Sequence, residues 1–232
     1  MHQIKVANNM LKIYAFFNKV RPRLKVCFAI YAVCAVSILL STAAFAAQTE
    51  TYTYNILREG KQIGAYHFEV SKDGPNMTIN ATMDIEAKIL FLTAYKARHT
   101  RTETYQNNTL QHIESKATYN GEGYAFSYDA QTGVLIRNGE KTQLENPVVT
   151  LTPFAHSFKG QYTNLTEKGK PTLATFADKG IVKKKAGIKL KPFRHIQMND
   201  GTLRDLWFTP EGVLDSLSYE KDRATISFQR RN

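Results

Sequence analysis

The chain has little cysteine, a single tryptophan and no acidic residue before Glu50. Both cysteines, Cys27 and Cys34, lie in the first 46 residues. The rest of the chain therefore excludes a disulfide framework, a thiolate metal cluster and a cysteine nucleophile. The sequence also lacks a Gly-rich phosphate loop, a Gly-x-Ser-x-Gly elbow and a His-Glu-x-x-His motif, which are signatures of nucleotide-binding proteins and of two large hydrolase classes.

Residues 1–46 have the pattern of an export signal. Six lysines and arginines precede an apolar run over residues 26–40, which is shorter than the roughly 20 residues that cross a bilayer. Ala44 and Ala46 supply the small side chains expected before a cleavage site. We predict a signal peptide over residues 1–46 and a periplasmic location, with an uncleaved inner-membrane anchor as the alternative. Cleavage removes six positive charges and no negative ones, so the formal charge of +11 becomes +5, which weakens a nucleic-acid interpretation.

The strongest periodic signal is strict alternation over residues 77–89. Every second residue is apolar and every residue between them is polar, which is the pattern of a half-buried strand. We expect Met83 and Ile85 in the core and Thr82 on the opposite face. At about 3.3 Å per residue this strand is roughly 40 Å long, a length typical of barrels and strongly coiled sheets.

Further strands follow at hairpin spacing. Turn pairs such as Asn107-Asn108, Asn120-Gly121 and Asn138-Gly139 separate the earlier ones. Residues 146–163 contain two prolines and no alternation, which indicates a crossing segment with one helical turn. The predicted strands are 52–58, 64–70, 77–89, 94–105, 110–119, 124–129 and 134–137, then 172–177, 181–191, 193–198, 203–208, 213–219 and 224–230.

These patterns predict an all-β fold. The expected architecture is an antiparallel meander that forms a long curved sheet or an open, incomplete barrel, preceded by the N-terminal signal helix. Residues 47–232 form one β-rich domain with a crossing segment near residues 146–170. Because strands do not alternate with helices, the pattern argues against a parallel nucleotide-binding sheet.

Four stretches carry a resemblance to a known family. They are Gly60-x-x-Ile63-Gly64, "ILFLTAYKARHTRTETY" at 89–105, "YNGEGY" at 119–124 and "LRDLWFTPEGVL" at 203–214. The chain resembles a family of uncharacterised exported proteins of Gram-negative bacteria. The resemblance implies a periplasmic β-meander, similar in shape to the open barrels of lipid- and lipoprotein-carrying periplasmic proteins, and it implies no catalytic residue.

The strand after Leu92 departs from the apolar–polar rule. One face carries charged and polar residues between two tyrosines, in the order Tyr95, His99, Arg101, Glu103 and Tyr105. We predict a ligand site on this face, with Arg101 at the wet mouth of a concavity where its guanidinium meets the headgroup of an amphiphile. A structural Arg101–Glu103 ion pair and a solvated strand end are the alternatives.

A second candidate is a basic strip in "IVKKKAGIKLKPFRH" at 181–195. Lysines occupy alternate positions on one side of the pattern, at Lys183, Lys185, Lys189 and Lys191. Such a strip fits anionic lipid headgroups, lipopolysaccharide or an acidic partner. Lysines also protect an edge strand from aggregation, which is the alternative.

The function that these features favour is non-enzymatic binding of a lipid or other hydrophobic envelope molecule in a curved β-sheet cavity. A structural or assembly factor that docks a partner through the basic strip is the second candidate, and a hydrolase is the third. We expect no cofactor, no metal and no nucleic acid.

Overall fold

The structure is a computed structural model that describes residues 48–89, 92–154, 161–186 and 189–231. The predicted signal helix, with Ala44 and Ala46, lies outside the described residues, and so do residues 155–160 of the predicted crossing segment. Within the described part of the chain, no helix has the length and apolar character that a membrane span requires.

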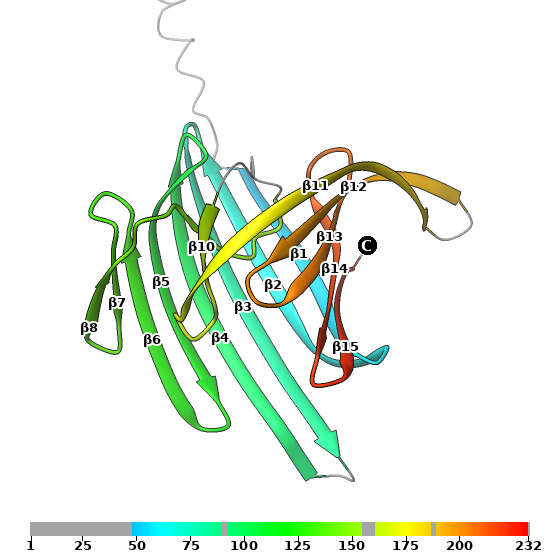
Figure 1. Ribbon diagram of the computed structural model, residues 1–232, viewed down its shortest axis with the longest axis horizontal. Coiled ribbons are helices and arrows are strands. Elements are labelled where there is room, and N and C mark those ends of the chain that lie inside the picture. Colours follow the sequence, from blue (N-terminus) through cyan, green and yellow to red (C-terminus); the bar gives the residue numbers. More distant parts are fainter. Residues whose placement is uncertain (1–47, 90–91, 155–160, 187–188, 232) are drawn as a thin grey trace, which may run out of the picture. The chain divides into compact units, whose positions relative to one another are not determined.

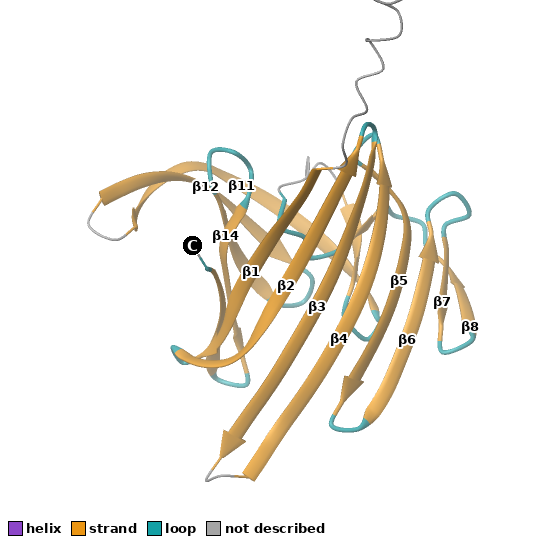
Figure 2. Ribbon diagram, turned by 180° about the vertical axis from the view of Figure 1, so that it is seen from behind, coloured by secondary structure: helices purple, strands orange, loops and turns teal. Residues whose placement is uncertain are grey.

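The first half of the described chain is an antiparallel meander of eight strands, each paired with the next. Figure 2 shows these strands side by side, with the β3–β4 hairpin reaching beyond its neighbours. Their bounds are β1 Gln48–Arg58, β2 Lys61–Asp73, β3 Asn76–Ile89, β4 Leu92–Gln106, β5 Thr109–Tyr119, β6 Glu122–Asp129, β7 Val134–Arg137 and β8 Glu140–Gln143.

The second half continues the same sheet and places its last strand beside the first. β15 pairs with β1, so the fifteen strands form a single sheet whose edges are β8 and β9 (Figure 1). All pairs are antiparallel except β9 with β10. The bounds are β9 Val148–Val149, β10 Gln161–Leu165, β11 Pro171–Ala186, β12 Lys189–Asn199, β13 Leu203–Phe208, β14 Leu214–Lys221 and β15 Ala224–Arg230. The predicted all-β antiparallel fold is confirmed, and the sheet is an open one.

Two asparagine–glycine pairs make the hairpin turns that the sequence predicts. Asn120 and Gly121 have φ values of 49° and 90°, and Asn138 and Gly139 have values of 49° and 89°. A two-residue turn with positive φ at both positions matches the right-handed twist of the strands, and asparagine and glycine tolerate that conformation best. The turn chemistry therefore sets the register of β5 with β6 and of β7 with β8.

The alternation in β2 and β3 produces the core. Phe68 and Val70 are buried on β2, and Ile79 and Met83 are buried on β3. Ile85, however, is only half-buried. The β2–β3 pairing ends at the pair Gly64–Ile85, so the last residues of β3 extend past the end of β2. The expectation that Ile85 lies in the core is therefore only partly correct.

Gly64 allows β2 to come close to β3. A Cβ atom at this position would lie 2.2 Å from the main-chain oxygen of Asp84, which is a severe overlap. This contact gives a physical reason for the last glycine of the Gly60-x-x-Ile63-Gly64 stretch.

Residues 148–154 form the crossing segment, which runs across the inner, buried side of the curved sheet from β4 to β14. The segment begins as β9, beside β10, and its Thr150 and Leu151 contact β4. At its other end, Leu214 of β14 donates its amide hydrogen to the carbonyl of Pro153 at 2.8 Å, and Phe154 bridges to Val213. The break in strand rhythm thus corresponds to a segment that connects the two halves of the sheet from inside.

Candidate functional site

The charged face predicted on β4 points inward and is buried. His99 is 1% exposed, Arg101 4% and Glu103 0%. The alternation along β4 therefore brings an arginine and a glutamate, together with a histidine, into the interior, where an unpaired charge would cost several kcal/mol.

Glu103 is at the centre of a buried network of one ion pair and two hydrogen bonds. The Nε of Arg101 is in ion-pair contact with the carboxylate but has no partner of hydrogen-bond geometry within the described residues. The Oε1 of Glu103 lies 2.6 Å from Nε of Arg101 and accepts a hydrogen bond of 2.5 Å from the hydroxyl of Thr150. Its Oε2 accepts a hydrogen bond of 2.6 Å from the hydroxyl of Tyr105. Arg101 also donates from Nη2 to the carbonyl of Leu151 at 2.6 Å. The network joins β4 to the crossing segment.

The expectation that Arg101 lies at a wet cavity mouth is wrong, because its side chain is 3% exposed. Burial by itself lowers the pKa of Arg101, but attraction to Glu103 outweighs it, so the pKa rises above the ordinary value. Burial, and then the charge of Glu103, raises the pKa of Tyr105 well above its usual range. The close, buried contact of Arg101 with Glu103 beside hydroxyl groups is the geometry of a structural ion pair.

His99 is held apart from this network. One ring nitrogen, Nε2, lies 2.8 Å from the hydroxyl of Ser115 on β5. Burial, reinforced by the charge of Arg101, lowers the pKa of His99 to about 3, so the ring is neutral near pH 7. Its Nδ1 and the buried hydroxyl of Tyr66 have no hydrogen-bond partner within the described residues.

Tyr95 does not join the other predicted site residues. It is half-buried near the far end of β4, where its ring lies 6.3 Å from the ring of Tyr119. It stands six residues from Arg101, about 20 Å along an extended strand. The structure therefore brings together Arg101, Glu103 and Tyr105 and leaves Tyr95 outside.

The crossing segment separates two cavities. The inner cavity has a volume of about 60 Å³ and lies between the crossing segment and apolar residues of β11–β15, with Arg101 and Arg204 in its wall. This volume suits a few ordered waters rather than a lipid chain, because one water needs about 10–15 Å³ by this measure.

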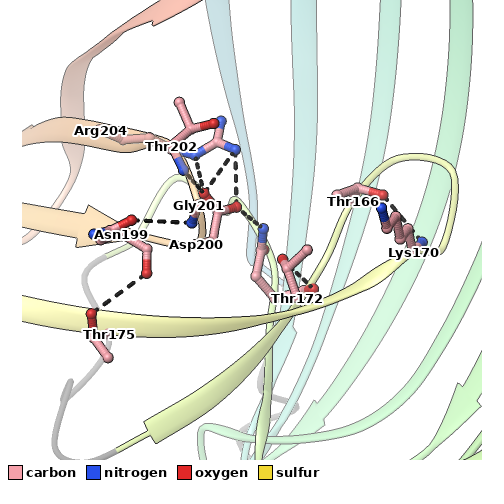
Figure 3. A network of polar contacts seen from close by, with 10 residues as sticks. Thr166, Lys170, Thr172, Thr175, Asn199, Asp200, Gly201, Thr202 and Arg204 are labelled. Carbon is pink, nitrogen blue, oxygen red and sulfur yellow. Dashed lines mark hydrogen bonds and ion pairs between the residues drawn. The ribbon is translucent and has the colours of Figure 1, made fainter.

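Arg204 is held in place by Asp200. The guanidinium binds both carboxylate oxygens of Asp200, at 3.2 and 2.9 Å (Figure 3). It also lies over the ring of Tyr219. Asn164 of β10 donates to the same carboxylate at 2.7 Å. These contacts connect β10 to β12–β14 and form the wall of the inner cavity.

The second cavity, the mouth cavity, has a volume of about 930 Å³ and lies on the other side of the crossing segment. Volumes of roughly 300–1,000 Å³ are typical of small-molecule sites. Thr150 and Phe154 line both cavities. Most of the large side chains around the mouth cavity are apolar or aromatic, namely Met77, Tyr105, Leu110, Tyr128, Val148, Phe154 and Tyr162.

Polar groups line the same cavity. Among the described residues of its lining, Lys72 is the one cation. The Nζ of Lys72 lies 3.5 Å from Glu50 and 5.0 Å from the ring centre of Phe154, and its side chain is 40% exposed. Glu145, Asn146 and Glu211 are further polar residues of the lining. Lys72 was not among the site residues predicted from the sequence, because its contacts with Glu50 and Phe154 come from distant parts of the chain.

The four lysines of the predicted basic strip do not share a face. In the β11–β12 pairing, Lys183 is opposite Pro192, whereas Lys191 is opposite Lys184. Opposite residues in an antiparallel pair lie on the same face, so Lys183 and Lys191 are on different faces. In the same register, Lys185 pairs with Leu190 and Lys189 with Ala186. The sequence interpretation placed all four lysines on one side because they have odd numbers. In this part of the β11–β12 hairpin, however, odd-numbered residues of β11 are opposite even-numbered residues of β12, so an odd number means a different face on each strand.

No group of three or more histidine, cysteine, aspartate or glutamate side chains in the described ranges could hold a metal ion.

Comparison with known proteins places the chain in a family. Residues 54–231 match the family model described as a domain of unknown function, DUF6134. The chain belongs to this family. The match covers the sheet from β1 to the residue after β15, so the family is a β-rich one of uncharacterised function.

One solved structure supports the architecture. The chain is similar to a crystal structure of a beta-barrel-like protein of the domain of unknown function DUF1849 from Brucella abortus, with a TM-score of 0.57 and 7% identity. The similarity covers 80% of this chain and 96% of the other. At this identity it shows a shared barrel-like fold alone. No curated protein matches the chain.

We predict that Glu103→Gln destabilises the protein by about 3–5 kcal/mol, because it leaves the Arg101 charge buried without its counterion. Adding Arg101→Met should recover part of that loss. The matched control is Arg98–Asp84, a pair at 3.0 Å that joins β4 to β3 and whose side chains are 68% and 62% exposed. Asp84→Asn should cost less than about 1 kcal/mol. Urea titrations of all the variants measure these values, and equal losses for the two pairs would contradict a buried ion pair.

We also predict that His99 makes the protein acid-sensitive. The unfolded chain takes up a proton on this ring below about pH 6.5, whereas the folded protein does so only near the lowered pKa. Stability is therefore complete above about pH 6.5 and declines as the pH falls, by about 2 kcal/mol near pH 5. His99→Gln should flatten this decline, and the control His112→Gln, on a half-exposed ring, should retain it. Unfolding free energies measured across this range would contradict the assignment if both variants followed the wild type.

Proposed function

We propose that this protein is a non-enzymatic binder of an amphiphilic small molecule, which it holds in the mouth cavity. The observation that carries the proposal is a cavity of about 930 Å³ with aromatic and aliphatic walls and a half-exposed cation in its lining. Binding sites for small molecules combine such walls with a few polar groups that fix orientation.

The arrangement supports a particular orientation of the ligand. Its apolar part lies against Met77, Leu110 and Tyr128, and an anionic headgroup meets Lys72. Arg101 then supports the site from behind rather than touching the ligand, because it is committed to Glu103 and Leu151. Tyr105 belongs to both features, since its ring lines the cavity and its hydroxyl binds Glu103.

A hydrolytic function has less support. His99 is buried against Ser115 and is absent from the lining of the mouth cavity, and the hydrogen bonds of Glu103 are directed to protein groups.

Export through residues 1–46 stays a prediction, which N-terminal sequencing of protein recovered from the periplasm would test.

Binding of two fluorescent probes tests the proposal: parinaric acid, which is anionic, and phenylnaphthylamine, which is neutral. Leu110→Trp should weaken both probes by filling the cavity. Lys72→Gln should weaken parinaric acid by roughly tenfold, because a charge-assisted hydrogen bond contributes about 1.5–3 kcal/mol, and should leave the neutral probe unchanged.

Lys61→Gln is the matched control, since Lys61 is exposed at the opposite end of the same strand, β2. Thermal melts check that each variant is folded. Absence of binding by the wild type, or equal effects of Lys61→Gln and Lys72→Gln, would overturn the proposal.

A further inference from the structure

The β11–β12 hairpin extends beyond the rest of the sheet. β10 pairs with β11 only up to Thr175, and β13 pairs with β12 only from Arg194 onward. We call residues 179–186 and 189–193 the ribbon. Over these residues β11 and β12 pair with each other, and neither pairs with a third described strand. Both views show the hairpin projecting from the sheet (Figures 1 and 2). Its base bends at a bulge between Asp178 and Gly180, where Gly180 has a φ of 80°.

The ribbon exposes large apolar side chains. Ile181 and Leu190 are each 68% exposed, and Val182 is 37% exposed. Lysines suffice to protect an open strand edge from aggregation, but edge protection does not require exposed isoleucine and leucine. Apolar residues gathered on one projecting element mark an interaction surface.

The ribbon is also strongly basic. Six lysines and no acidic residue occur between positions 179 and 191. Lys184 and Lys191 lie directly opposite each other in the register, an arrangement that is unfavourable in isolation. An anionic partner would relieve this repulsion. Nζ of Lys184 also lies 4.7 Å from the ring of Trp207 and donates to Ser216 at 3.2 Å, which ties this face of the ribbon to β13 and β14 and leaves Lys191 exposed beside it.

The split of the lysines between the two faces identifies the partner. A folded acidic protein presents one surface and would meet one face of the ribbon. A bilayer interface is fluid and can surround both faces, with apolar side chains among the acyl chains and lysines reaching to the headgroups. We propose that the ribbon inserts edge-on into the surface of an anionic lipid membrane. This proposal does not depend on the mouth cavity.

Site-specific fluorescence tests the proposal in the full chain. A Cys27→Ser/Cys34→Ser background carries one environment-sensitive label, at Leu190→Cys or, as control, at Leu203→Cys, which is 55% exposed on β13. With vesicles of phosphatidylcholine and phosphatidylglycerol, the label at position 190 should brighten and shift to the blue. Pure phosphatidylcholine and high salt should abolish this response, and the label at position 203 should stay unchanged. Equal responses at the two positions, or none at position 190, would overturn the proposal.

Charge reversals test the edge-on geometry. Lys183→Glu and Lys191→Glu, on opposite faces, should each weaken binding to the anionic vesicles. The double variant should bind at least roughly tenfold more weakly, since each lysine near an anionic surface contributes about 1 kcal/mol. The matched control is Lys141→Glu/Lys221→Glu, at exposed positions away from the ribbon, which should have no effect. If only one face mattered, or if soluble polyglutamate gave the same response as vesicles, the ribbon would be a docking site for an acidic protein instead.

Discussion

The buried carboxylate of Glu103 is the interaction on which the interior of this protein depends. Among the described strands the sheet does not close between β8 and β9, so their pairing leaves that part of the core uncovered. The chain's own crossing segment covers it, and Glu103 binds that segment through Thr150 while Arg101 binds it through Leu151. A buried charge is costly without such partners, which explains why the acid, the base and the segment occur together.

The position of the crossing segment also decides what the interior can do. On one side it leaves a cavity of about 60 Å³, enough for a few waters. On the other side it leaves about 930 Å³ between apolar walls. Arg101 and Glu103 hold the crossing segment, and that segment lines both cavities. Lys72, which is paired with Glu50, lies in the lining of the larger one.

The sequence predicted the features that depend on local rules. The alternation in β2 and β3 and the asparagine–glycine turns follow from the strand period and from φ preferences, and the structure confirms them. It could not predict the burial of Arg101, because the covering residue Leu151 is 50 positions away. Nor could it show that Lys183 and Lys191 lie on opposite faces, since that depends on the register across the β11–β12 turn. Local periodicity gives the strands, whereas long-range pairing decides which charges meet water.

Hydrogen exchange of the crossing segment in a Thr150→Val variant tests the account most directly. Valine keeps the size of the side chain and removes the hydroxyl that binds Glu103. Because a hydrogen bond to a charged group contributes about 1.5–3 kcal/mol, amides of residues 148–152 should exchange at least roughly tenfold faster, while those of β5 and β6 stay unchanged. Unchanged exchange in the crossing segment would show that Glu103 does not hold it, and would contradict the account.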